Sequence, residues 1–523
     1  MKKRTAARSM AALMGAAMVL TACGGGNTTA PTTGASSGGE TQTASESAES
    51  GKITKTDIVV GQASDIVTLD PAGQQDTTSG VLMKHAYSTL LDVDNEGKVV
   101  PDLAESYEMK SDTEYVFKLR EDACFWDGTP VTAQDVKFSL DRAKGMPKTK
   151  SNTSKIEEVT VNGDHEVTIK LTEPYAAFKT IVTQHNLSIL SEKAVTEAGD
   201  SYGDVDNLLG SGPFKVTEWV PNDHYWGEMP IATSITCRVI PEGSARTIAL
   251  EAGEIDVVWS VDPTDCANVE SNPDVKLLSQ PSTGIDYVGM NTQKEKFSDK
   301  RVRQAINYAL DKQAFVDTII EGRGLVANSY INAAIPGWTD EVEAYPYDPE
   351  KAKELLAEAG YPDGFECSIF VNGDLRTRSA QILQAQLADV GIKVDISTYE
   401  WGALLDTLNA GEHEMFLLGW SNTSFDPDGS TYQLFYSGNH GATGNRAFFS
   451  NDKVDELILS AQRESEESKR MELYKELQFV LHEESPWCPL YYKENNVGVR
   501  ADLKGFTLHA GAQHYLGNCH YEE

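Results

Sequence analysis

The chain has 523 residues, with 45 Lys and Arg against 79 Asp and Glu, so its formal net charge is −34. Such a chain lacks the clustered positive charge that nucleic-acid binding requires, and it would not lie flat on an anionic membrane. Its hydrophobic fraction of 40% predicts an ordered globular protein, and its length allows two or three domains.

The N-terminus has the order of a secretory signal. Lys and Arg residues come first, an apolar run follows from about Met10 to Ala22, and Cys23 comes next. The apolar run is too short to span a bilayer as a helix. A Cys directly after a small residue at the cleavage point resembles a bacterial lipobox. The alternative is an ordinary signal that is cleaved near Ala22, with Cys23 incidental.

We therefore expect a signal peptide over 1–22, and a lipidated Cys23 with a flexible linker over 23–55. The linker from Asn27 to Gly51 contains almost no apolar residue larger than Ala, so it cannot bury enough surface to order itself. The protein would then work outside the cytoplasm, anchored to the cell membrane by its lipid.

Six cysteines remain after Cys23, and an even number outside the cytoplasm permits up to three disulfides. None lies in a C-x-x-C pair or at a metal-ligand spacing with His. We expect zero to two bridges, with Cys237 and Cys266 as the suggested pair. The six are Cys124, Cys237, Cys266, Cys367, Cys488 and Cys519.

In chain order, the first clear elements are two strands and a helix. Residues 113–119 and 166–171 alternate between apolar and polar types, as half-buried strands do. Thr132 and Asp135 have the spacing of a capping box, which predicts a helix directly after Thr132.

The second half reads as a series of α/β units. We expect a helix from a cap at Ser298 to near Gly322, and another that starts with the Asp348 cap and Pro349. A third helix, over about 380–390, ends at a glycine and leads into a strand at 392–396. The apolar run 415–420 predicts a buried strand.

No catalytic or cofactor-binding fingerprint is present, so we expect no enzyme activity and no cofactor. His509, His514 and His520 gather near the C-terminus, but solvated or hydrogen-bonded histidines explain them better than a metal site. Asp426 and Asp428 follow the predicted strand at 415–420. They fit a ligand-binding loop and a simple Asx turn equally well.

Several segments together resemble a known family. They include PDLAESY at 101–107, LEAGEID at 250–256, VRQAINYALD at 302–311 and AGYPDG at 359–364. From about Asp57 onward the chain resembles solute-binding proteins of the peptide/nickel class of ABC importers, the group that holds the dipeptide-, oligopeptide- and glutathione-binding proteins.

The resemblance implies an α/β fold of two lobes joined by a hinge, with a ligand cleft between the lobes and an extra domain beside the first. We expect the hinge to cross near 289–291 and near 486–492. The expected divisions are 56–90 and 209–290 for lobe I, 91–208 for the extra domain, 291–488 for lobe II, and 489–523 for a return to lobe I.

The resemblance also implies a function. A monomer would trap a short peptide in the cleft and deliver it to the transmembrane subunits of an ABC permease. Glutathione, a nickel chelate or haem are alternative ligands on the same fold. An exported hydrolase and a receptor that feeds a sensor are further alternatives.

The expected ligand contacts follow from the family pattern. In dipeptide-binding relatives, an Asp three residues after the Trp that matches Trp420 pairs with the ligand ammonium. Here that position is Thr423, which leaves Asp426 and Asp428 as acidic alternatives. The ligand carboxylate is met by an Arg just before a lobe II helix, and the candidates here are Arg376 and Arg378. The other expected contacts are Asp76, Thr77, Thr78, Trp401, Trp420 and Arg446.

Overall fold

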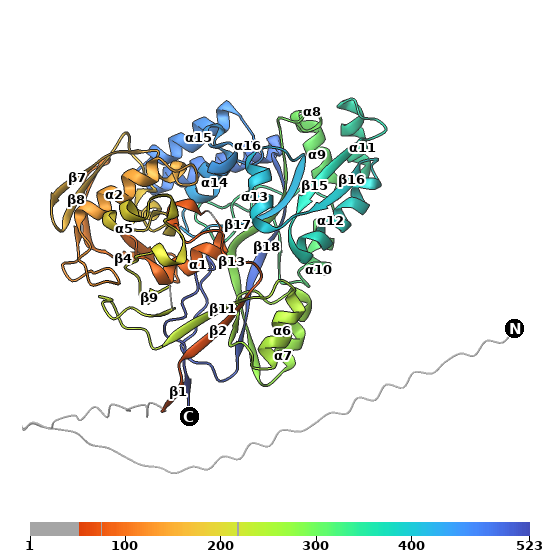
Figure 1. Ribbon diagram of the computed structural model, residues 1–523. Helices are drawn as coiled ribbons and strands as arrows, with labels where there is room; N and C mark the ends of the chain where they lie inside the picture. Colours follow the sequence, from red (N-terminus) through yellow and green to blue (C-terminus); the bar gives the residue numbers. More distant parts are fainter. Residues whose placement is uncertain (1–51, 75, 217–218) are drawn as a thin grey trace, which may run out of the picture. The chain divides into compact units, whose positions relative to one another are not determined.

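The computed structural model describes residues 52–74, 76–216 and 219–523 (Figure 1). The expected signal peptide, the lipidated Cys23 and most of the expected linker lie outside the described residues. In the part of the chain that is described, no helix is long and apolar enough to cross a membrane.

The described residues build one large sheet from nine strands, in the order β11-β2-β12-β18-β13-β17-β15-β16, with β14 paired to β18. We call β11, β2 and β12 the first half-sheet, and β17, β15 and β16 the second. The strand bounds are β2 (Asp57–Gln62), β11 (Ser234–Val239), β12 (Val257–Val258), β13 (Val275–Met290), β14 (Gly324–Val326), β15 (Glu366–Val371), β16 (Lys393–Thr398), β17 (Met415–Ser421) and β18 (Trp487–Arg500).

Two long strands, β13 and β18, pair with each other and join the half-sheets (Figure 1). β18 pairs with β12 at Gly498 and Val499, whereas β13 pairs with β17 from Gly284 onward. A register shift lies between Pro281 and Ile285, and such irregularities bend long strands. β13 pairs with β18 on both sides of this shift, and β17 joins it as a second neighbour from Gly284 onward.

Helices cover both faces of the second half-sheet. One core contains Val288, Ile306, Leu383 and Leu417, and the opposite core contains Tyr287 and other apolar residues. Neighbouring residues of β13 thus point to opposite faces, as the period of a strand requires. The helices are α8 (Glu295–Ser298), α9 (Lys300–Ala309), α10 (Lys312–Thr318), α11 (Pro349–Glu358), α12 (Gly373–Ala388), α13 (Trp401–Asn409), α14 (Asp428–Phe435), α15 (Asp452–Arg463) and α16 (Glu467–Glu484).

Two predicted helices were wrong in their bounds. The helix expected over about 380–390 is α12, which begins at Gly373, so Arg376 and Arg378 lie within it and not before it. Asp299, not Ser298, caps α9, and the segment to Gly322 is divided between α9 and α10 because Asp311 starts a new helix by accepting from the Ala314 amide. At both Asp299 and Asp311, the Asp side chain accepts from a free backbone amide of the following turn, which favours the start of a helix there. The Asp348 cap of α11 is confirmed.

The first half-sheet separates two of the cysteines. Cys237 packs with the core that contains Val257, while Cys266 packs with the core that contains Val258. Because successive strand residues face opposite sides, the two cysteines lie on opposite faces of the sheet. The suggested Cys237–Cys266 bridge is wrong, and all six cysteines in the described residues are free.

The inserted segment forms an antiparallel sheet in the order β5-β6-β8-β7, which we call the antiparallel domain together with its helices. The two predicted strands are confirmed as β6 and β8, and the Thr132–Asp135 capping box opens α2. The bounds are β5 (Ala104–Ser111), β6 (Glu114–Leu119), β7 (Ile156–Gly163), β8 (Glu166–Leu171), α2 (Ala133–Lys144), α3 (Lys150–Thr153), α4 (Phe178–Ile181) and α5 (Glu192–Ala198).

The remaining elements complete the first half. The helix α1 leads toward the hairpin of β3 and β4, and α6 and α7 cover one face of the first half-sheet (Figure 1). Their bounds are α1 (Thr77–Ala86), α6 (Gly243–Glu251), α7 (Cys266–Ser271), β1 (Ile53–Lys55), β3 (Leu91–Val93), β4 (Val99–Pro101), β9 (Phe214–Lys215), β10 (Val220–Pro221) and β19 (Tyr521–Glu522).

Candidate ligand site between the lobes

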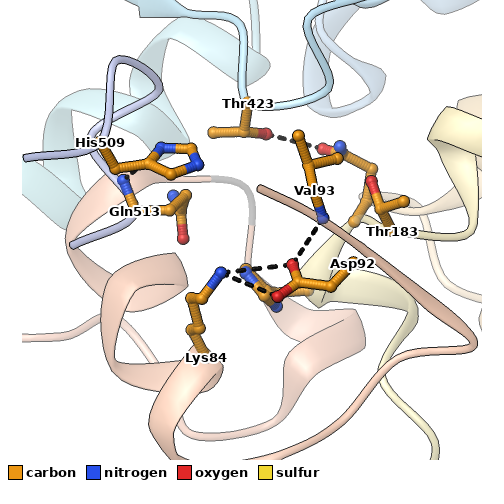
Figure 2. Close-up of a pocket in the computed structure, with 9 residues that line it drawn as sticks. Lys84, Asp92, Val93, Thr183, Thr423, His509 and Gln513 are labelled. Atoms are coloured by element: carbon orange, nitrogen blue, oxygen red, sulfur yellow. Dashed lines mark hydrogen bonds and ion pairs between the residues drawn. The ribbon is translucent and has the colours of Figure 1, made fainter. Parts of the chain in front are cut away.

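A small polar cavity of about 10 Å³ lies where the antiparallel domain, α1, the C-terminal segment and the loop after β17 meet (Figure 2). This volume is about enough for one water molecule. The cavity joins segments that are far apart in the sequence. Its lining residues are Lys84, Asp92, Val93, Thr183, Gln184, His185, Thr423, His509 and Gln513.

An ion pair forms one wall of the cavity. The Lys84 Nζ lies 3.0 Å from Oδ2 and 3.3 Å from Oδ1 of Asp92 (Figure 2). Burial opposes ionisation of Asp92, but the charge and hydrogen bond of Lys84, the neighbouring His185 and the Val93 amide together outweigh burial and lower the pKa of this carboxyl. On the opposite side, the Thr423 hydroxyl donates to Gln184 Oε1 at 2.9 Å, so the loop after β17 is bonded to the antiparallel domain.

Two histidines of the cavity are neutral. Burial, with repulsion from Lys84, lowers the pKa of His185 to about 3 and that of His509 to about 4. The His509 Nδ1 accepts from the amides of Gly511 at 3.1 Å and Gln513 at 3.3 Å. The single ring proton of His509 therefore lies on Nε2, which faces the backbone of Val93 and Asp94.

A second cationic group is Arg376, near the start of α12. Its Nη2 is 4.0 Å from Asp286 Oδ1, its Nη1 is 3.4 Å from Asn372 Oδ1, and its guanidinium lies 5.8 Å from the centre of a Trp401 ring. Its Nε is buried and has no hydrogen-bond partner in the described part of the chain. Asp286 is shared, because Lys493 Nζ lies only 2.9 Å from its Oδ2. Arg376 is thus weakly paired.

Arg378 has a full partner instead. Its Nη2 donates to both oxygens of Asp262 at 2.9 and 2.8 Å. Asp262 follows β12 in the first half, whereas Arg378 lies on α12 in the second half, so the pair bridges the two halves. Of the two arginines expected to meet a ligand carboxylate, Arg376 keeps the more available donors.

The structure does not bring Asp426 and Asp428 to the cavity. Asp426 accepts from both terminal nitrogens of Arg470, at 3.0 and 2.5 Å. Asp428 accepts from the Tyr175 hydroxyl at 2.6 Å and from Gln462 at 2.9 Å. Burial, with the charge of Asp426, raises the pKa of Asp428 to about 6. Both carboxylates join α14 to neighbouring elements.

Three other expected contacts have structural partners. Asp76 caps α1 by accepting from the Ser79 amide at 2.9 Å, and burial raises its pKa. The Trp420 indole donates to the Gly429 carbonyl at 3.0 Å. Arg446 is buried and donates to Asn409 Oδ1 at 3.0 Å.

Thr77 and Thr78 form the half-buried first turn of α1, and Trp401 begins α13. Sequence reasoning missed Lys84, Asp92 and Gln513, because they lie in segments with no recognisable motif. It took His509 for a solvated or hydrogen-bonded histidine rather than a metal ligand and did not expect it at a cavity; the described residues contain no cluster that could hold a metal.

The comparisons with known proteins settle the family. The model of the bacterial extracellular solute-binding proteins, family 5, matches residues 98–442. The chain belongs to this family. The glutathione-binding protein GsiB of Escherichia coli K12 is 32% identical over 479 residues, which cover 86% of this chain and 92% of that protein. The predicted membership of the peptide/nickel class is confirmed.

Solved structures confirm the two-lobed fold. DppA from Helicobacter pylori in complex with the peptide STSA has a TM-score of 0.85 at 28% identity, and the match covers 90% of this chain and 99% of that one. AppA from Bacillus subtilis in complex with a nonapeptide has a TM-score of 0.82 at 25% identity, covering 90% and 100%. These relatives are binding proteins, and the protein is a solute-binding protein of the same class.

Proposed function

We propose that the protein is the lipid-anchored substrate-binding protein of an ABC importer and carries a short peptide or peptide-like acid to its permease. It would act as a monomer without enzyme activity, anchored through Cys23. The peptide-bound relatives support the ligand class. The order of charged start, apolar run and Cys23 supports the anchor.

The observation that carries the ligand assignment is the weak pairing of Arg376. Its Nε is buried without a partner, and its nearest carboxylate, Asp286, is 4.0 Å away and shared with Lys493. A partly exposed guanidinium with an unpaired Nε can still hold a ligand carboxylate in two parallel hydrogen bonds. Trp401, beside it, offers a flat apolar surface to the adjoining part of a ligand.

The size of the expected effect follows from affinity arithmetic. Micromolar binding corresponds to about 8 kcal/mol. Losing one buried, hydrogen-bonded charge costs roughly 2–5 kcal/mol. Arg376→Met should therefore weaken binding by at least about 30-fold, and so should amidation of the peptide carboxylate.

Calorimetry on four forms of one peptide tests this proposal: free, blocked at the carboxylate, blocked at the amine, and blocked at both ends. The control variant is Arg301→Met, because Arg301 is exposed and pairs with Asp299 outside the site. If amidation is tolerated and acetylation is not, Arg376 is not the anchor, and the ligand is held at its ammonium instead.

A second candidate ligand is glutathione, which is favoured by the likeness to GsiB. Mass spectrometry of the small molecules released from purified protein by denaturation would separate glutathione from ordinary peptides, a nickel chelate or haem. The same measurement on added labelled peptide tests for hydrolysis, because a transport receptor returns its ligand intact.

Closure of the lobes on the ligand is part of the proposal. The segment at 281–285 of β13 and the facing part of β18 are the hinge we propose, since the register of β13 and β18 shifts there and β17 begins to pair with β13. Small-angle scattering should show a smaller radius of gyration with saturating peptide, and an unchanged radius would argue against closure.

A further inference from the structure

Phe425, in the loop after β17, has an unusual backbone conformation. Its φ of 55° lies in the left-handed region, which a bulky side chain enters only at a cost in free energy. Such a conformation persists only where the surrounding structure holds it, and it occurs preferentially at ligand clamps and in segments that switch between two states. The backbone of Phe425 is therefore held in place by what its ring contacts.

The ring of Phe425 lies between segments of both halves. On its own side it packs against the core that contains Tyr287. On the other side it lies against Gly97, in the turn between β3 and β4, so closely that a Cβ added to Gly97 would stand 2.7 Å from Cδ1 of the ring. It also meets the ring of His509 edge to face, with the ring centres 5.6 Å apart. The ring thus connects the second half of the protein to the first.

The two partners of the ring are themselves fixed. Gly97 has a φ of 82°, and its amide donates to the Asp94 carbonyl at 3.0 Å, which closes the turn. Any other side chain at this position would be strained and would collide with the Phe425 ring. The ring of His509 is held by the Gly511 and Gln513 amides, which donate to its Nδ1. We call the surface formed by Gly97 and His509 the seat of the Phe425 ring.

We propose that Phe425 is a latch for the closed state: its ring packs on the seat when the lobes close and leaves the seat when they open. This inference rests on the lobe closure of the proposed function. A contact that exists in only one of two states shifts the equilibrium toward that state. A ligand enclosed between the lobes is then held longer, because the ring has to leave its seat before the ligand can dissociate.

Polar contacts between the halves cannot replace this latch. The hydrogen bond of Thr423 with Gln184 and the ion pair of Arg378 with Asp262 can exchange their protein partners for water when the lobes open, so each adds little to the closed state. The ring contact has no such substitute, because opening exposes its apolar surface to water. Phe425 should therefore influence closure more than either polar pair.

A second phenylalanine provides a matched control within one lobe. Phe448 has a φ of 51° and is half-buried, as Phe425 is. A Cβ added to Gly411, whose φ is 72°, would stand 2.9 Å from Cζ of the Phe448 ring, and the ring centre of His440 lies 5.4 Å from that of Phe448. All three residues belong to the second half. This group has the same strain and the same packing as the latch, but it does not connect the lobes.

Two double-mutant cycles test the latch, one with Gly97→Ala and Phe425→Ala, the other with Gly411→Ala and Phe448→Ala. The probe is a mixture of tripeptides with free ends, and the member that binds the wild type most tightly is used for stopped-flow dissociation. Phe425→Ala should weaken binding about tenfold, almost entirely through faster dissociation, whereas Phe448→Ala should change it less than about twofold. Gly97→Ala should weaken binding in the wild type but have little further effect in Phe425→Ala, because the added methyl no longer meets a ring.

The control cycle separates the latch from plain packing. Gly411→Ala and Phe448→Ala should couple in the melting temperature, as packed neighbours do, but neither should alter dissociation of the tripeptide. If the two phenylalanine variants release the tripeptide at the same rate, or if the effects of Gly97→Ala and Phe425→Ala on affinity simply add, the inference is wrong.

Small-angle scattering without added peptide keeps this inference apart from the proposed function. Phe425→Ala should have a larger radius of gyration than Phe448→Ala, because it populates the open state more, whatever the cleft binds. If no tripeptide binds the wild type, the peptide assignment of the proposed function fails and the radii alone decide on the latch. Equal radii in that case would overturn it.

Discussion

Replacing Asp428 by Asn should change how the stability of the protein depends on pH. Asp428 is 1% exposed and accepts hydrogen bonds from Tyr175 of the antiparallel domain and Gln462 of α15. Burial and the nearby charge of Asp426 raise its pKa from 3.8 to about 6. The folded protein therefore binds this proton more tightly than the unfolded chain does.

The sign follows from linkage. A carboxyl with a raised pKa stabilises the fold most when it is protonated, and that contribution is lost as the pH rises from about 4 to about 6. Each pKa unit corresponds to about 1.4 kcal/mol, so the total change is about 3 kcal/mol. Asn does not titrate, so the variant avoids this loss. Relative to the wild type, Asp428→Asn should gain up to about 3 kcal/mol between pH 4 and pH 7.

Urea denaturation of both proteins at four pH values across this range measures the difference in the free energy of unfolding. The amide also replaces one acceptor by a donor, which adds a destabilising offset that does not vary with pH. Tyr175→Phe is a useful second variant, because the lost hydroxyl donor should raise the pKa of Asp428 further. This variant should therefore lose more unfolding free energy than the wild type as the pH rises. A difference between Asp428→Asn and the wild type that is flat with pH would refute the reasoning.

Three other outcomes are expected. Arg470→Met should lower the free energy of unfolding by about 3–5 kcal/mol, because it leaves Asp426 as a buried charge without its partner; thermal denaturation beside the exposed control Lys469→Met checks this, and equal melting temperatures would contradict it. Thr132→Ala should cost about 1 kcal/mol through the lost cap of α2, measured in the same way, and a stability equal to the wild type would show that the cap contributes nothing. Cys23→Ser should release the protein from membranes in its own host, and a variant that still fractionates with membranes would disprove lipid anchoring.

Local elements were predictable where their cause is local. The caps at Thr132 and Asp348 and the alternating strands at 114–119 and 166–171 depend on neighbours within a few residues. The helix expected from Ser298 was wrong because a second strong cap, Asp311, lies inside an apolar pattern that looked continuous. Resemblance of motifs from about Asp57 onward was enough to predict the two-lobed fold.

The sequence by itself determined the export signal pattern, the family and the helix starts at Thr132 and Asp348, because these depend on residues that are close along the chain. Only the tertiary structure decided which charges are already paired. Asp426 meets Arg470, 44 residues away, and Asp428 meets Tyr175, 253 residues away, on a neighbouring domain. No spacing rule predicts such contacts, because they arise when the packing of separate apolar cores brings distant loops together. The same packing leaves Arg376 with free donors.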